Sequence, residues 1–76
     1  SLRYRLYLNN QGNDPVHLIM AIRNFLNIGL KEAKAVSDEI PTALFVKISG
    51  DEDQARLDTF IGKLDEYEVN YMLKRL

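Results

Sequence analysis

The sequence predicts an α+β fold in which a three-stranded antiparallel sheet is covered on one face by three helices. Three segments alternate apolar and polar residues with a period of two, as half-buried strands do: residues 2–9, 42–48 and 67–73. The segments between them carry apolar residues at helical spacing and are bounded by proline or glycine. The predicted element order is therefore strand, helix, helix, strand, helix, strand.

The connections between these elements determine the expected sheet topology. Two helices after the first strand return the chain antiparallel to it, and one helix between the second and third strands makes those two parallel to each other. If the first strand lies in the centre, every neighbouring pair is antiparallel. We therefore predict a two-layer α/β sandwich with strand order 2-1-3. A hydrophobic content of 46% over 76 residues fits a single domain, residues 1–76, with one core.

Turn-forming residues join the first strand to the first helix. The even-numbered residues from 2 to 8 are apolar and form the inner face of the strand. The stretch NNQGND follows, and Asp14 with Pro15 is the pattern of a helix N-cap with proline at the first helical position. This helix is predicted to run to about Leu26. Gly29 is then expected to take the left-handed conformation that ends a helix without a Cβ clash.

A second, shorter helix is predicted after Gly29, and Pro41 ends it. Its lysines, Lys31 and Lys34, are expected to face water. Its apolar stripe is predicted to consist of Leu30, Ala33, Val36 or Ser37, and Ile40.

The second strand, residues 42–48, is followed by a third helix that opens at Ser49 or Gly50. Three acidic residues, 51–53, fill its first turn, where the helix dipole favours negative charge, and we interpret them as a charged helix start and not as a metal site. The odd-numbered apolar residues of 67–73 form the inner face of the last strand. The core stripe of the third helix is predicted to consist of Leu57, Ile61 and Leu64, with Phe60 beside them.

Composition and motifs argue against catalysis. The single histidine, His17, has no serine or cysteine partner at a recognisable spacing, no carboxylate lies inside an apolar run, and the four glycines stand apart. We therefore expect no enzyme, no cofactor and no metal site. No apolar run approaches 18 residues and no leader is recognisable, so we expect a cytoplasmic protein with no membrane contact.

The net charge of −1 argues against nucleic acid as a partner of the molecule as a whole. Ten basic residues face eleven acidic ones, so bulk attraction to a polyanion is not expected. Only a local basic patch could bind one.

The first helix carries a second stripe at helical spacing, turned from its core stripe by roughly 100°. One sheet cannot bury both stripes fully. Part of the second could lie under the second helix, above all Ile19; otherwise it forms an exposed apolar strip suited to docking a partner helix. The stripe consists of Val16, Ile19, Met20 and Arg23.

The outer face of the sheet is the competing candidate site. Aromatic side chains framed by arginine on an open sheet can stack single-stranded bases, and the same residues could bury a homodimer face or remain in solvent. These alternatives stay open at this point. The outward residues are Arg3, Arg5, Tyr7, Phe45, Lys47 and Met72.

The segment from Val16 to Pro41, with Arg23 followed by NIGLKEAKAVSDEIP, resembles the C-terminal domain of the bacterial ribosomal stalk protein. The resemblance implies a non-enzymatic protein-interaction domain whose partners are translational GTPases and the ribosome. Pro15 and Met20 stand where that family usually carries basic residues. The contact residues that the resemblance implies are Val16, Ile19, Arg23, Gly29, Lys31 and Lys34.

A shorter likeness concerns YLNN and PVHLI, which look similar to the strand, loop and helix start of the ClpS protease adaptor, a family with the same fold. That family is expected to carry an aspartate pair where this chain has Asn9 and Asn10. A ClpS-like adaptor is therefore the third functional hypothesis, after the stalk-type domain and the sheet-face module.

Overall fold

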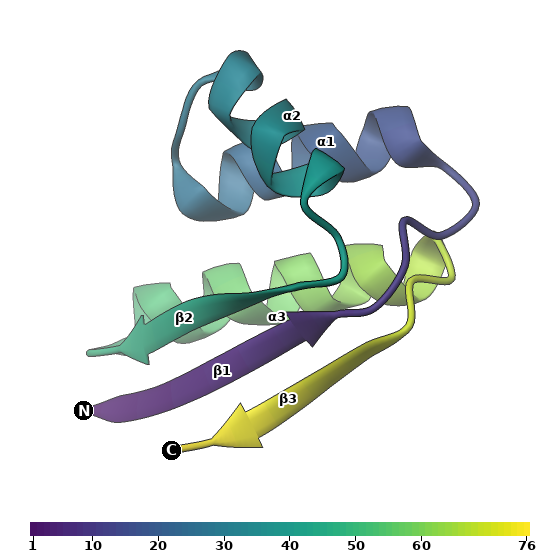
Figure 1. Cartoon of the computed structure of the whole chain (residues 1–76). Helices are drawn as coiled ribbons and strands as arrows, with labels where there is room; N and C mark the ends of the chain where they lie inside the picture. The colour runs from purple at the N-terminus through teal and green to yellow at the C-terminus, as the bar shows by residue number, and fades with distance from the viewer.

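The computed structural model describes all residues from Ser1 to Leu76 and has the predicted architecture (Figure 1). The three strands form one antiparallel sheet in the order β2-β1-β3, as the connection rules predicted. No helix combines the length and the apolar content that a membrane crossing requires. The elements are β1 (Leu2–Leu8), α1 (Pro15–Leu26), α2 (Leu30–Asp38), β2 (Thr42–Ile48), α3 (Asp51–Glu66) and β3 (Tyr71–Arg75).

The core lies between the sheet and the helices. On the central strand the even-numbered residues face inward, as predicted, and Leu6 and Leu8 are fully buried. Leu18 and Ile22 from α1 and Phe60 from α3 meet them there. Phe60 is a full member of the core and Ile61 is only half-buried, so the predicted stripe of α3 is rotated slightly toward Phe60.

Helix α1 begins where predicted, but a different residue from the predicted one ends it. The Asp14 side chain accepts a hydrogen bond from the backbone N–H of His17, and Pro15 occupies the first helical position. The left-handed residue at the C-terminus is Asn27, with φ 54° and ψ 51°, and not Gly29 as expected. Asparagine tolerates this conformation better than most residues, which is why it can end a helix in place of glycine.

Gly29 instead has an extended backbone and forms the N-cap of α2. A Cβ at this position would meet a carboxylate oxygen of Glu32, one turn further on, so glycine leaves room for that acidic side chain at the helix start. Leu30, predicted to be in the core stripe, is instead 59% exposed at the first helical position of α2. Ala33 and Ser37 are the residues of α2 that are fully buried.

The connection from α3 to β3 also differs from the prediction. The strand begins at Tyr71, and the residues before it form a helix C-cap of the Schellman type. In this cap Val69 N–H donates to the Leu64 carbonyl at 2.9 Å, and Glu68 N–H donates to the Asp65 carbonyl at 3.1 Å. The alternation of apolar and polar residues that starts at residue 67 therefore comes from Tyr67 and Val69, which face inward in the helix cap and do not belong to the strand.

Glu68 occupies the left-handed position of this cap, with φ 56°, where glycine is the usual residue. A side chain in this conformation costs about 1–2 kcal/mol, and the greater backbone freedom of unfolded glycine offsets part of that. We expect Glu68→Gly to raise the free energy of unfolding by roughly 0.5–1 kcal/mol in urea titrations. Asn27→Gly is the matched control and should gain less, since asparagine tolerates the conformation. A loss of stability in Glu68→Gly would contradict this account of the cap.

The loop between β1 and α1 forms hydrogen bonds with the segment that joins α3 to β3. Asn13 N–H donates to the Tyr67 carbonyl at 2.7 Å, and Asn9 N–H donates to the Asn70 carbonyl at 2.8 Å. The Asn10 side-chain oxygen accepts from the N–H groups of Gly12 and Asn70, at 3.0 and 3.1 Å. Two segments far apart in the sequence are therefore joined by backbone and amide hydrogen bonds, and we call this set of contacts the asparagine clasp.

Candidate docking site on helices α1 and α2

A shallow groove lies between α1 and α2 on the solvent side of the helix layer. The two helices turn other faces toward the core: α1 buries Leu18 and Ile22, and α2 buries Ala33 and Ser37. The second stripe of α1 is therefore left facing outward. Val16 is 67% exposed and Met20 is 45% exposed. Ile19 is half-buried against the core and contributes its remaining surface to the groove.

All seven residues predicted for the partner-binding site line this one groove. Leu30 is the eighth, and the sequence reading missed it because it assigned Leu30 to the core. The available signal was spacing: Leu30 lies one helical turn before Lys34, so the two side chains share a face of α2. The lining residues are Val16, Ile19, Met20, Arg23, Gly29, Leu30, Lys31 and Lys34. Their role in binding a partner stays a prediction.

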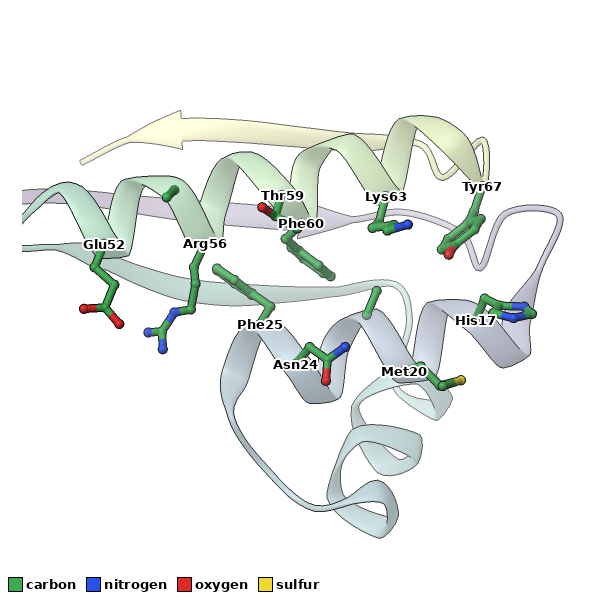
Figure 2. Close-up of a pocket in the computed structure, with 12 residues that line it drawn as sticks. His17, Met20, Asn24, Phe25, Glu52, Arg56, Thr59, Phe60, Lys63 and Tyr67 are labelled. Carbon is green, nitrogen blue, oxygen red and sulfur yellow. The ribbon is translucent and has the colours of Figure 1, made fainter.

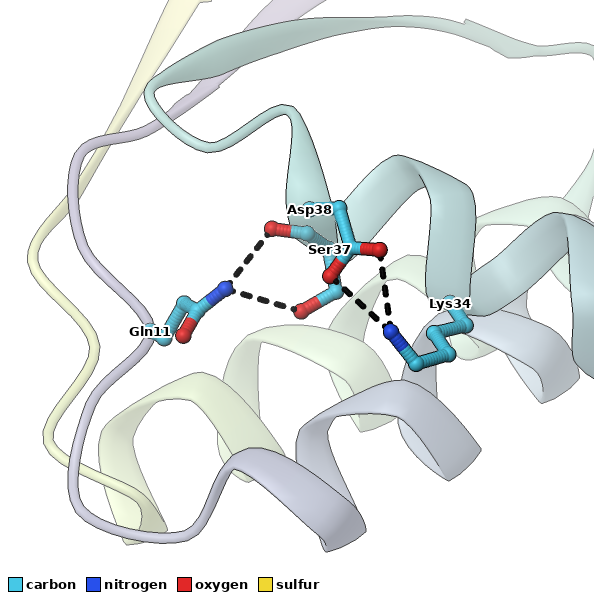
Figure 3. A network of polar contacts seen from close by, with 4 residues as sticks. All are labelled: Gln11, Lys34, Ser37 and Asp38. Atoms are coloured by element: carbon cyan, nitrogen blue, oxygen red, sulfur yellow. Dashed lines mark hydrogen bonds and ion pairs between the residues drawn. The ribbon is translucent and has the colours of Figure 1, made fainter.

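The three cations of the groove differ in how they are compensated. Lys34 Nζ lies 3.0 Å from a carboxylate oxygen of Asp38, one turn along the same helix (Figure 3). Arg23 and Lys31 form no ion pair. The free positive charge of the groove therefore comes from Arg23 at the end of α1 and Lys31 at the start of α2.

Helix α2 is held in place by a contact from the β1–α1 loop, also visible in Figure 3. The Gln11 side-chain amide donates to the Ser37 carbonyl at 2.9 Å and lies 3.4 Å from the Ser37 hydroxyl. Ser37 is 1% exposed, and no buried side-chain nitrogen or oxygen atom lacks a partner. This contact satisfies a buried hydroxyl and a helix-end carbonyl, and so it fixes the far end of one wall of the groove.

A second groove runs along the other side of α1, between α1 and α3, and encloses about 410 Å³ (Figure 2). Its floor is formed by Phe25 and Phe60, whose rings stack with centroids 4.5 Å apart and planes 2° from parallel. Met20 borders both grooves.

The basic side chains around this second groove are each close to a carboxylate on their own segment. Lys63 lies 3.7 Å from Glu66, Arg56 lies 3.8 Å from Asp53, and His17 lies 2.8 Å from Asp14. The hydrogen bonds from His17 hold the pKa of Asp14 below its usual range. The two grooves are therefore chemically different, because only the one between α1 and α2 presents uncompensated positive charge beside exposed apolar surface.

The six residues of the alternative site also lie where the sequence placed them. Arg3, Arg5 and Lys47 are exposed on the outer face of the sheet, Phe45 is 60% and Met72 is 51% exposed, and Tyr7 is half-buried. The residues of each candidate site therefore lie together, and the two sets are on opposite sides of the molecule. No group of three or more His, Asp or Glu side chains could hold a metal ion.

The sequence matches the family described as the ribosomal protein L7/L12 C-terminal domain over residues 4–60. A similar protein is large ribosomal subunit protein bL12 of Alkaliphilus metalliredigens, 35% identical over 71 residues, which cover 93% of this chain and 56% of that protein. The bL12 proteins of Natranaerobius thermophilus and Shewanella baltica are 39% identical over 49 residues and 38% identical over 52 residues. These matches cover 64% and 68% of this chain, and 39% and 43% of those proteins.

The chain spans about half the length of the curated relatives that it matches, or less. Those relatives are named as ribosomal proteins and not as enzymes. The match includes the segment that carries the resemblance to the stalk protein, from Val16 to Pro41, and most of the residues that form the helix layer. The chain belongs to the ribosomal protein L7/L12 C-terminal domain family.

Proposed function

We propose that this domain is a non-enzymatic docking module that captures a translational GTPase in the groove between α1 and α2, in the cytoplasm and beside the ribosome. One observation carries the proposal: exposed apolar side chains and two unpaired cations from different helices meet in a single groove. The family supports the ribosomal setting, since its relatives are named as proteins of the large ribosomal subunit.

The lining of the groove indicates the kind of surface that it fits. Val16 and Leu30 offer exposed apolar area, and Met20 offers a flexible side chain that adapts to different partners. Arg23 and Lys31 stand beside this area. A partner helix with an apolar stripe and acidic residues along one edge would bury the former and pair with the latter.

The balance of these contacts predicts how binding responds to salt. Rim charges of this kind mainly accelerate association, and salt screens them, whereas apolar contacts slow dissociation. Because Met20 and Pro15 stand where the resemblance to the stalk protein implies basic residues, we expect apolar burial to carry a larger share of the affinity here. Raising the salt concentration should therefore weaken binding without abolishing it.

The test is an NMR titration of the isotope-labelled domain with a purified translational GTPase in its GTP-bound form. We expect chemical-shift changes or line broadening confined to residues 16–34, on α1 and the start of α2. Titration with the same GTPase at 50 and 200 mM salt should show the same residues affected, with a higher apparent Kd at the higher salt. A spectrum that stays unchanged, or changes that lie on the strands, would contradict the proposed site.

A further inference from the structure

The near-neutral net charge of the domain hides a strong separation of charge between its two layers. All eleven acidic residues lie in helices and loops. The strands contain basic residues and no acidic ones. The cations of the strands are Arg3, Arg5, Lys47, Lys74 and Arg75. Four of these, all except Arg75, lie on the outer face of the sheet that no helix covers.

These cations are placed directly opposite one another. Arg3 pairs in register with Lys47, and Arg5 pairs with Lys74. Like charges opposite each other on neighbouring strands destabilise a sheet, and none of the four forms an ion pair with a carboxylate. The outer face is therefore an uncompensated positive surface that a bound polyanion would stabilise.

Aromatic and thioether side chains lie among the cations. Phe45, 60% exposed, stands in register with Arg5 on the central strand, and Tyr7 stands in register with Met72 on β3. A flat ring at the surface of a sheet offers a platform on which an unpaired base can stack, while neighbouring cations contact the phosphates. The face thus combines the two features that sequence-tolerant binding of single strands requires.

Charge distinguishes between the occupants that the sequence left open. Two copies of the domain meeting through this face would bring eight cations together with no acidic partner, so the face is poorly suited to a symmetric dimer. A duplex offers phosphates but no exposed base faces for the aromatic residues. Unpaired stretches in cells are chiefly RNA, because DNA is mostly held as duplex.

We propose that the outer sheet face binds single-stranded RNA, with Arg3, Arg5, Lys47 and Lys74 contacting phosphates and with Phe45 and Tyr7 stacking on bases. The acidic helix layer does not prevent this, because it lies on the opposite side of the sheet and its field is screened within about 8 Å at physiological salt. The site is separate from the groove between α1 and α2, so RNA and a protein partner can be bound at the same time.

The test is fluorescence anisotropy of a labelled 12-nucleotide oligouridylate titrated with the domain between 50 and 200 mM KCl. If three to four phosphates are contacted, log K should fall against log salt with a slope of about −2 to −3. Arg5→Gln with Lys74→Gln should reduce that slope by about 1.4, since each lost phosphate contact removes about 0.7. Phe45→Ala should weaken binding about tenfold and leave the slope unchanged, because it removes stacking alone.

The matched control is Arg56→Gln with Lys63→Gln, which removes the same number of positive charges from the helix layer and should change neither affinity nor slope. Circular dichroism of each variant checks that the fold is intact. The proposal is overturned if the oligomer does not bind at 50 mM KCl or if the control variant loses as much affinity as the sheet variant. It is also overturned if duplex RNA or a DNA 12-mer of matching sequence binds more tightly, or if light scattering shows that Phe45→Ala acts by dissociating a dimer.

Discussion

Replacing Gly12 by alanine should lower the free energy of unfolding by about 3 kcal/mol or more, because two costs add together. The residue has φ +67°, a left-handed conformation that alanine adopts with strain. A Cβ at this position would also collide with the backbone carbonyl of Tyr67. Because that carbonyl accepts the 2.7 Å hydrogen bond from Asn13 N–H, the collision would open the asparagine clasp and leave its polar groups unpaired.

A loss of this size is serious for a chain of 76 residues, whose total stability is expected to be roughly 4–11 kcal/mol. Urea unfolding followed by far-UV circular dichroism would measure it. The matched control is Gly62→Ala, because Gly62 lies within α3 and a Cβ there would have nothing within 4 Å. That variant should gain about 0.5–1 kcal/mol from better helix propensity. If both variants shifted stability equally, the close contact at Gly12 would not be the cause.

If the proposed docking of a translational GTPase is correct, reversing the charges of Arg23 and Lys31 together should weaken its capture about a hundredfold. Reversal replaces each attraction by repulsion of the partner's acidic residues, and because like charges facing each other at an interface are costly, we expect a loss of about 1.4 kcal/mol, a tenfold change in affinity, at each position. The melting temperature should hardly move, because both side chains are exposed and neither forms an ion pair. A negative charge is unfavourable at the end of α1 and favourable at the start of α2, so the helix-dipole effects nearly cancel.

The control for this double variant is Lys47→Glu with Lys74→Glu, which makes the same change in net charge on the outer sheet face. Surface plasmon resonance with immobilised GTPase should show normal binding for that control. Lys34→Glu alone should have a smaller effect than Lys31→Glu alone, because Lys34 is already paired with Asp38. If the sheet-face control lost as much affinity as the groove variant, capture would depend on overall charge and not on this groove.

The element order and the sheet topology could be predicted from the sequence because each signal was local and unambiguous. Strict alternation marked the inner faces of β1 and β2, and Asp14 with Pro15 marked the start of α1. Short connections and the rules for antiparallel pairing then left one arrangement in which every neighbour is antiparallel. These predictions are confirmed by the structure.

The errors came from positions where two residues could satisfy the same backbone requirement. Asn27 and Gly29 both tolerate a left-handed conformation, and the chain uses Asn27 to end α1 while Gly29 is the extended N-cap of α2. The start of β3 was misplaced because Tyr67 and Val69 point inward in a helix cap just as they would in a strand. A glycine at position 68 would have revealed this cap, but the chain carries glutamate there.

The residues that line the candidate groove could be predicted better than the pairing of its charges. Helical spacing identified the stripe of α1, and the resemblance to the stalk protein added Gly29 and the lysines of α2. Sequence alone did not tell the paired cation, Lys34, from the free ones, since that depends on the rotamers of Lys34 and Asp38. It also placed one acidic residue, Glu68, on the sheet, because the last strand was predicted to start at residue 67 and not at Tyr71.

The central position of β1 has a consequence for how the chain folds. Neither partner strand is close to β1 in the sequence. The pair with the least chain between its residues in β1 and β2 is Leu8 and Thr42, and in β1 and β3 it is Leu8 and Tyr71. The sheet therefore contains no hairpin, and each pairing must close a long loop before it forms any hydrogen bonds. Such a chain should fold more slowly than a helical bundle of equal length. During synthesis, β1 is made before both of its partners, so the sheet can be completed only after β3 has been made.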